Sequence, residues 1–111
     1  MKEGDIAKAT LDQSDGLIKF RPVVLLKQLP PSGDWLVCGV TSSVKYYVKD
    51  FDILIKEEDE DFSDTGLLKS SIIRLGFLGI IPEKEIEESI GYLNIEKYKV
   101  LISNLLQSTS N

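Results

Sequence analysis

The 111-residue chain contains no histidine, and this absence excludes several classes of site. Histidine is the usual general base near neutral pH, the proton-transfer partner of a catalytic serine or cysteine, and the commonest transition-metal ligand. Ser-His-Asp and Cys-His catalytic systems are therefore excluded, as is nearly every transition-metal site. Any catalysis must depend on Arg, Lys, Asp, Glu, Tyr, Ser or Thr side chains, and we expect it to need no cofactor.

Cysteine and long apolar runs are also scarce. Cys38 is the single cysteine, so neither an intrachain disulfide nor a cysteine-based zinc site can form. The longest apolar run lies around residues 37–40 and is far too short to span a membrane. Residues 1–5 lack the charged and then apolar pattern of a signal region. We expect a cytoplasmic protein without a membrane partner, folded as one domain over residues 1–111.

Basic residues are outnumbered, 13 against 18 acidic ones, which gives a formal net charge of −5. The acidity is concentrated in residues 57–64, which read Glu-Glu-Asp-Glu-Asp-Phe-Ser-Asp. Outside this run the two signs nearly balance, so the total charge does not exclude a nucleic-acid surface elsewhere on the molecule. We predict that the acidic run is a solvated, mobile loop.

Apolar periodicity and turn signals predict a mainly β (α+β) fold. Strands are expected over residues 4–11, 18–26, 35–40, 51–55, 70–75 with a continuation through 77–81, and 89–93. Turns at 12–16 and 29–34 would join the first three strands in an antiparallel meander. Asn94 is expected to cap a C-terminal helix that ends before residue 107, with one buried face formed by Tyr98, Leu101, Ile102 and Leu105. These elements predict a small, strongly bent sheet or barrel with the amphipathic helix packed against it.

Two polar residues stand at the ends of the expected second and third strands. Arg21 lies near the start of one strand, and Thr41 follows the end of the next. An antiparallel pairing would bring these two ends together. An arginine beside a hydroxyl group can bind phosphate, because both donate hydrogen bonds to its oxygens. Arg21 and Thr41 are therefore the centre of the candidate site.

Five segments of the chain, taken in order, resemble the MazF/PemK toxins over residues 4–106. They are Gly4-Asp5-Ile6, Arg21-Pro22-Val23-Val24-Leu25, Val40-Thr41-Ser42-Ser43, Gly66-Leu67-Leu68-Lys69-Ser70-Ser71-Ile72-Ile73-Arg74 and Ile90-Gly91-Tyr92-Leu93. The resemblance implies a small SH3-like barrel of the MazF/PemK/CcdB type that forms a homodimer. It also implies the toxin of a type II toxin-antitoxin pair, a growth-inhibiting mRNA interferase whose partners are single-stranded RNA and a cognate antitoxin protein.

The reaction that this resemblance implies is a metal-independent, sequence-specific cleavage of RNA. The 2′-hydroxyl of the RNA attacks the adjacent phosphorus, leaving a 2′,3′-cyclic phosphate and a 5′-hydroxyl. Arg21 and Thr41 would be the catalytic residues, with Arg21 stabilising negative charge on the phosphate oxygens. The substrate-binding residues would be Lys19, Ser42, Ser43 and Arg74.

Two departures from the family pattern leave alternatives open. Some relatives have a carboxylate two residues after the later arginine, where this chain has Gly76, and the acidic run is unusual for an RNA-binding protein. A catalytically inactive relative, acting as a protein- or nucleic-acid-binding module, is therefore the main alternative. A further alternative is an SH3-like barrel that binds a peptide through Trp35, Tyr46 and Tyr47.

Overall fold

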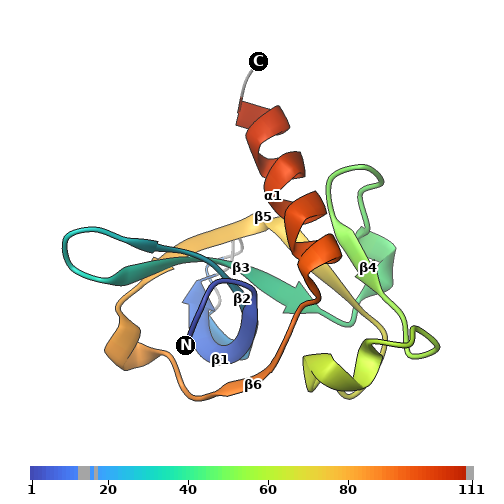
Figure 1. The fold of residues 1–111 in the computed structure, drawn as a ribbon, viewed down its shortest axis with the longest axis horizontal. Coiled ribbons are helices and arrows are strands. Elements are labelled where there is room, and N and C mark those ends of the chain that lie inside the picture. Colours follow the sequence, from blue (N-terminus) through green and yellow to red (C-terminus); the bar gives the residue numbers. More distant parts are fainter. Residues whose placement is uncertain (13–15, 17, 110–111) are drawn as a thin grey trace.

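Strands dominate the chain, and one helix closes it (Figure 1). The computed structural model describes residues 1–12, 16 and 18–109. The strands are β1 (Asp5–Asp12), β2 (Ile18–Leu29), β3 (Asp34–Thr41), β4 (Ile53–Ile55), β5 (Ser71–Ile81) and β6 (Ser89–Tyr92). The helices are the 3₁₀ turns η1 (Val44–Tyr46), η2 (Phe62–Thr65) and η3 (Glu83–Glu85), and the α-helix α1 (Ile95–Thr109).

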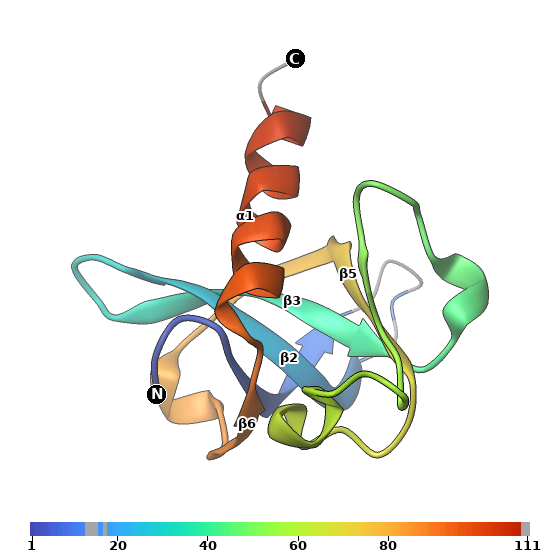
Figure 2. The same cartoon turned by 45° about the vertical axis from the view of Figure 1, so that its right-hand side comes forward.

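The strands form a single antiparallel sheet in the order β4-β5-β3-β2-β1-β6. The sheet curls into a half-barrel, and α1 rises from one of its faces (Figures 1 and 2). The prediction of a small, mainly β barrel with a C-terminal helix is thus confirmed. The expected meander is present as well, because β1, β2 and β3 are neighbours in chain order. The strand expected over 51–55 is shorter, since β4 contains only Ile53–Ile55.

Both faces of the sheet carry a core, because alternate residues of each strand point to opposite sides. One core lies beneath α1 and includes Ile6, Val24, Leu26, Cys38, Val40, Ile55, Ile73, Leu75 and Leu101. The other lies on the opposite face and includes Ala7, Ala9, Leu11, Val23, Leu25, Trp35, Val37 and Ile81. We call these the helix-side core and the far-side core. A polar residue in a regular strand therefore lies on the same face as the residues two positions away, and the core to which those residues belong identifies that face.

The predicted buried face of α1 is confirmed. Leu101 is fully buried in the helix-side core, and Tyr98, Ile102 and Leu105 pack against that core. The Tyr98 hydroxyl also donates a hydrogen bond to the carbonyl of Leu26 at 2.7 Å. The helix extends past its expected end to Thr109, since the residues that follow position 106 include neither glycine nor proline to stop it. Within the described part of the chain, no helix is both long and apolar enough to cross a membrane.

Most acidic side chains of the acidic run are exposed, as expected of a solvated loop, and two of its aspartates contact the start of α1. The Asn94 side chain accepts the backbone N–H of Lys97 at 2.8 Å, as the predicted cap, and donates to Asp61 at 2.6 Å. The Lys97 ammonium forms ion pairs with Asp59 at 3.2 Å and with Asp61 at 3.0 Å. A lysine in the first turn of α1 therefore pairs with part of the run, an arrangement that charge counting along the sequence does not reveal.

Candidate functional site

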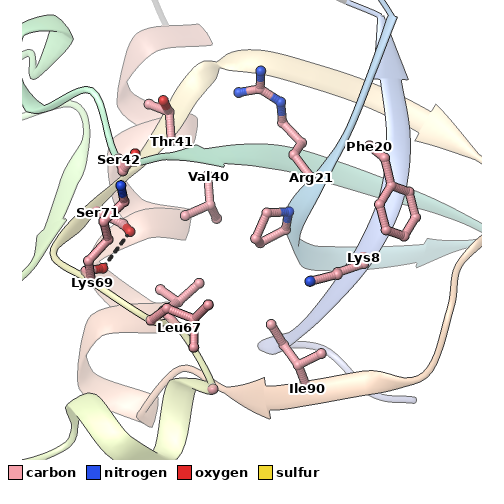
Figure 3. A pocket seen from close by; sticks show the side chains of 13 residues that line it. Lys8, Phe20, Arg21, Val40, Thr41, Ser42, Leu67, Lys69, Ser71 and Ile90 are labelled. Carbon is pink, nitrogen blue, oxygen red and sulfur yellow. Dashed lines mark hydrogen bonds between the residues drawn. The ribbon is translucent and has the colours of Figure 1, made fainter.

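The pairing of β2 with β3 places the two predicted catalytic residues together. Val23 pairs with Gly39 in the antiparallel ladder. This is the last recorded pair of the ladder, and Arg21 and Thr41 each lie two residues beyond it on their strands. Figure 3 shows the two side chains pointing to the same side, Arg21 from the first part of β2 and Thr41 from the end of β3. The juxtaposition expected from the sequence is therefore present.

Arg74 joins Arg21 on the far-side face through a shared aromatic ring. The guanidinium of Arg21 lies 5.4 Å from the centroid of the Phe77 ring, and that of Arg74 lies 4.1 Å from the same centroid. Arg74 also lies 5.2 Å from the ring of Tyr46. These are cation–π distances, so the Phe77 ring contacts both guanidinium groups. The Nε atom of Arg74 is buried and has no hydrogen-bond partner within the described part of the chain.

Gly39 is the reason that Phe77 can lie where both arginines reach it. Gly39 pairs with Arg74 across β3 and β5. A Cβ atom added to Gly39 would lie 3.2 Å from both Cβ and Cδ2 of Phe77, tighter than an ordinary contact. The glycine therefore allows the ring to approach the sheet between the arginine-bearing strands. Phe77 was not singled out from the sequence, because an isolated phenylalanine in a strand gives no sign of what it will contact.

An irregularity in β5 aims Arg74 at this site. The neighbours Cys38 and Gly39 on β3 pair with Leu78 and Arg74 on β5, so residues 75–77 have no partner on β3 and form a bulge. Bulges of this kind redirect side chains at the edges of sheets. Gly76 lies within the bulge and is exposed, so this position adds no side chain to the surface next to Arg74.

Asp52 accepts a hydrogen bond from the backbone of the bulge and is a second residue that the sequence analysis did not identify. Its carboxylate accepts the backbone N–H of Leu75 at 3.2 Å and that of Val48 at 3.0 Å. The residue is only 4% exposed. The one available signal was an aspartate in the otherwise apolar run 51–55, which was interpreted as part of a strand.

The thiol of Cys38 is not part of the site. Its side chain is fully buried in the helix-side core. Burial raises the pKa of the Cys38 thiol well above its usual range, and the negative charge of Asp52 raises it further. The thiol is therefore neutral at physiological pH and is not available as a nucleophile.

The serines after Thr41 differ in their relation to it. The Thr41 hydroxyl accepts the backbone N–H of Ser43 at 3.2 Å, which leaves its own proton available to donate to a ligand. Ser42 borders the pocket described below, whereas Ser43 is exposed and lies at the start of η1. Lys19 pairs with Leu11 in the backbone of β2, but its side chain lies outside the described residues.

A pocket of about 430 Å³ adjoins Arg21 and Thr41, which both border it. Its apolar floor includes Val40, Leu67 and Ile90, and the Arg21 and Thr41 side chains point away from that floor (Figure 3). Lys8 and Lys69 line opposite sides of it. None of the described lining residues is acidic, although the chain carries a net charge of −5. The lysines were not predicted, because their proximity to Arg21 depends on how β1 and residues 66–69 fold around the strand ends.

Trp35, the central residue of the peptide-binding alternative, is buried. Trp35 is 2% exposed and belongs to the far-side core, with its indole N–H donating to Glu83 at 3.4 Å. It cannot present its ring to a peptide without unfolding that core. Tyr46 and Tyr47 are exposed, but the Tyr46 ring contacts Arg74 rather than lining a groove with a tryptophan.

The described residues contain no group of three or more His, Cys, Asp or Glu side chains placed to hold a metal ion. The groups that the site offers are cationic and hydroxyl donors together with aromatic rings. Such donors are suited to a phosphate ester.

Comparison with known proteins supports the fold. No protein-family model and no curated protein sequence matches the chain. Among solved structures, the Mycobacterium tuberculosis toxin MazF-mt6 superposes with a TM-score of 0.67 at 20% sequence identity, and the match covers 94% of each chain. The chain therefore has a MazF-like fold, which agrees with the resemblance detected in its sequence.

Proposed function

We propose that this chain with a MazF-like fold is a metal-independent, sequence-specific endoribonuclease that cleaves single-stranded RNA. The observation that carries the proposal is that the Arg21 side chain of β2 and the Thr41 side chain of β3 point to the same side, beside a pocket lined by Lys8 and Lys69. In the cell it would be the cytoplasmic toxin of a type II toxin-antitoxin pair. The chain would act as a single domain, form a homodimer and be inhibited by a cognate antitoxin protein.

The reaction needs groups that this site can supply. When the RNA 2′-hydroxyl attacks the neighbouring phosphorus, negative charge grows on the phosphate oxygens before the 5′-oxygen leaves. Arg21 can donate two parallel N–H bonds to those oxygens, and the Thr41 hydroxyl can donate another. The pKa of arginine lies above about 12, so we assign Arg21 to electrostatic stabilisation rather than to the role of base. Loss of one such donor typically costs about a hundredfold in rate.

The groups around this pair would bind the remainder of the RNA. Arg74 shares the Phe77 ring with Arg21 and would hold a neighbouring phosphate, with Ser42, Ser43 and Lys19 as further contacts. Lys8 and Lys69 would attract the chain where it passes the adjoining pocket. Phosphate contacts of this kind determine position and affinity, while the cleavage sequence depends on contacts with the bases.

One observation favours the second candidate function, a nucleic-acid-binding module without catalysis. None of the described residues that line the pocket carries a carboxylate or an imidazole to accept the 2′-hydroxyl proton, and Gly76 stands where some relatives have a carboxylate. This candidate predicts that RNA binds and remains intact.

The deciding experiment incubates the purified protein with a long single-stranded RNA in the presence of EDTA. We expect discrete fragments that end in a 2′,3′-cyclic phosphate, identified by mass spectrometry. The Arg21→Ala variant should cut about a hundredfold more slowly. A Lys99→Ala variant, which removes an exposed positive charge from α1, should cut at the parent rate. Binding without cleavage, tested over RNAs of varied sequence, would favour the second candidate, and equal rates for parent and Arg21→Ala would refute the assignment of Arg21.

A further inference from the structure

Asp52 joins the two segments that bear the aromatic and cationic groups around Arg74. One segment follows η1, which contains Tyr46, and reaches Val48; the other is the β5 bulge, which starts at Leu75. The carboxylate of Asp52 accepts one backbone N–H from each segment, at 3.0 Å from Val48 and at 3.2 Å from Leu75. The segments have no strand pairing with each other at these residues, so the carboxylate bridges them directly.

The bridge is adjacent to Arg74 along the backbone. Leu75 follows Arg74, and its side chain is buried in the helix-side core while Arg74 points to the opposite face. Fixing the Leu75 N–H therefore fixes the peptide plane from which the Arg74 side chain leaves the strand. On the other side, fixing Val48 holds the end of the loop that brings the Tyr46 ring to 5.2 Å from the Arg74 guanidinium.

Asp52 itself is firmly held in place. It is 4% exposed, and its own backbone N–H donates to the carbonyl of Val48 at 2.9 Å. The preceding residue, Phe51, has its carbonyl bound by the Asn104 side chain of α1 at 3.0 Å. The carboxylate therefore has a defined position relative to both the loop and the helix.

We propose that Asp52 is a positioning residue that acts through Arg74, holding its guanidinium between Tyr46 and Phe77 where it can meet a phosphate next to the one bound by Arg21. The inference rests on the proposed function in taking Arg74 as a substrate-binding group. Asp52 touches neither RNA nor the reacting atoms. Its contribution is to orient Arg74 before the substrate arrives, so less ordering is required when RNA binds.

Substitution of Asp52 by asparagine tests this role with almost no change in shape. The amide keeps one oxygen to accept an N–H, but it presents an NH₂ group to the other donor, so one of the two segments is released. A merely structural role would lower the amount of folded enzyme and reduce kcat. Release of Arg74 should instead raise KM for RNA about tenfold with kcat nearly unchanged, because the binding group and not the reacting group is disturbed.

Two comparisons isolate the path through Arg74. In an Arg74→Ala background the Asp52→Asn change should have no further effect on KM, since the group that it positions is already absent. The matched control is Asp59→Asn. The Asp59 carboxylate likewise accepts a backbone N–H, from Lys56 at 3.0 Å, but it lies beside α1, so its loss should leave KM at the parent value.

A spectroscopic readout makes the test independent of cleavage. The chain has only two arginines, so NMR can resolve and assign both Nε–H signals with the help of Arg74→Ala. We expect the Arg74 signal of the parent to be displaced by the Phe77 and Tyr46 rings and protected from solvent exchange, and to lose both properties in Asp52→Asn.

Each outcome decides the proposal. An Arg74 Nε–H signal that is unchanged in Asp52→Asn would overturn it whether or not the parent cleaves RNA. A KM rise of equal size in the parent and in the Arg74→Ala background would also overturn it. If the signal changes as expected but the parent leaves RNA intact, Asp52 does position Arg74 and it is the proposed cleavage that fails.

Discussion

The close packing of two backbone segments at Gly66 and Gly91 predicts the cost of adding a single methyl group. Gly66 follows η2 with a φ of +72°, and a Cβ atom there would collide with the carbonyl of Ile90. In the facing segment, a Cβ on Gly91 would collide with the carbonyl of Asp64. The segment after the acidic run thus lies directly on β6, and neither glycine leaves room for a side chain.

The size of the effect follows from two separate costs. A left-handed conformation costs an L-residue about 1–2 kcal/mol, and forcing a methyl group into a packed site costs about 1–3 kcal/mol. Alanine also reduces the conformational freedom of the unfolded chain, which offsets about 0.4–1 kcal/mol of this destabilisation. We therefore expect Gly66→Ala to lower the free energy of unfolding by about 3 kcal/mol. For a domain of this size the melting temperature should fall by roughly 12 °C.

The chain offers a matched control for the same chemical change. Gly76 has no positive φ, and a Cβ there would meet nothing closer than an Arg74 side-chain nitrogen at 4.0 Å. The free energy of unfolding of Gly76→Ala should therefore lie within about 0.5 kcal/mol of the parent value. Urea titrations of the parent and the two variants, followed by the fluorescence of the buried Trp35, would provide the comparison.

A Gly91 variant tests whether the same close approach of the two backbone segments causes both losses of stability. Because Gly66 and Gly91 belong to the same close approach, opening it with one alanine should reduce the cost of the other, so the double variant should lose less than the sum of the single losses. The reasoning would be refuted if Gly66→Ala matched Gly76→Ala in stability. That result would mean that residues 64–66 can move away from β6 at little cost.

Two further predictions concern charged residues. Lys69→Met keeps the aliphatic stem but removes a charge from the pocket, so the affinity for a 2′-deoxy oligonucleotide should fall and its salt dependence should weaken by roughly 0.7 in the slope of log K against log salt. Lys84→Met, outside the pocket, should change neither, and an unchanged slope for Lys69→Met would exclude a phosphate contact there. The N–H of Lys56, and then Lys97, hold the pKa of Asp59 below its ordinary value of 3.8. The stability from this carboxylate is therefore present above that value and lost as pH falls through the lower folded-state pKa. The melting temperature of Asp59→Asn should accordingly be lower than that of the parent at neutral pH, and the two values should converge in acid. A constant difference in melting temperature across the pH range would contradict the assignment.

Local patterns in the sequence were sufficient to predict much of the fold. Asn94 was identified as a helix cap because a side-chain oxygen before an apolar 3.6-residue period can satisfy an unpaired N–H of the first turn, as it does for Lys97. The meander followed from alternation and turn residues, which act over a few positions. The meeting of Arg21 and Thr41 was also predictable, because antiparallel pairing of consecutive strands fixes which ends come together.

The rest of the site depends on contacts between residues far apart in the chain. Asp52 reaches the N–H of Leu75 across 23 positions, and Phe77 lies between two arginines only because a bulge in β5 and the bare backbone of Gly39 allow it. Two aspartates of the acidic run pair with a lysine on the final helix. Sequence patterns report on neighbours one turn or one pleat away, whereas these contacts depend on strand register and sheet curvature, which the packing of the whole chain decides.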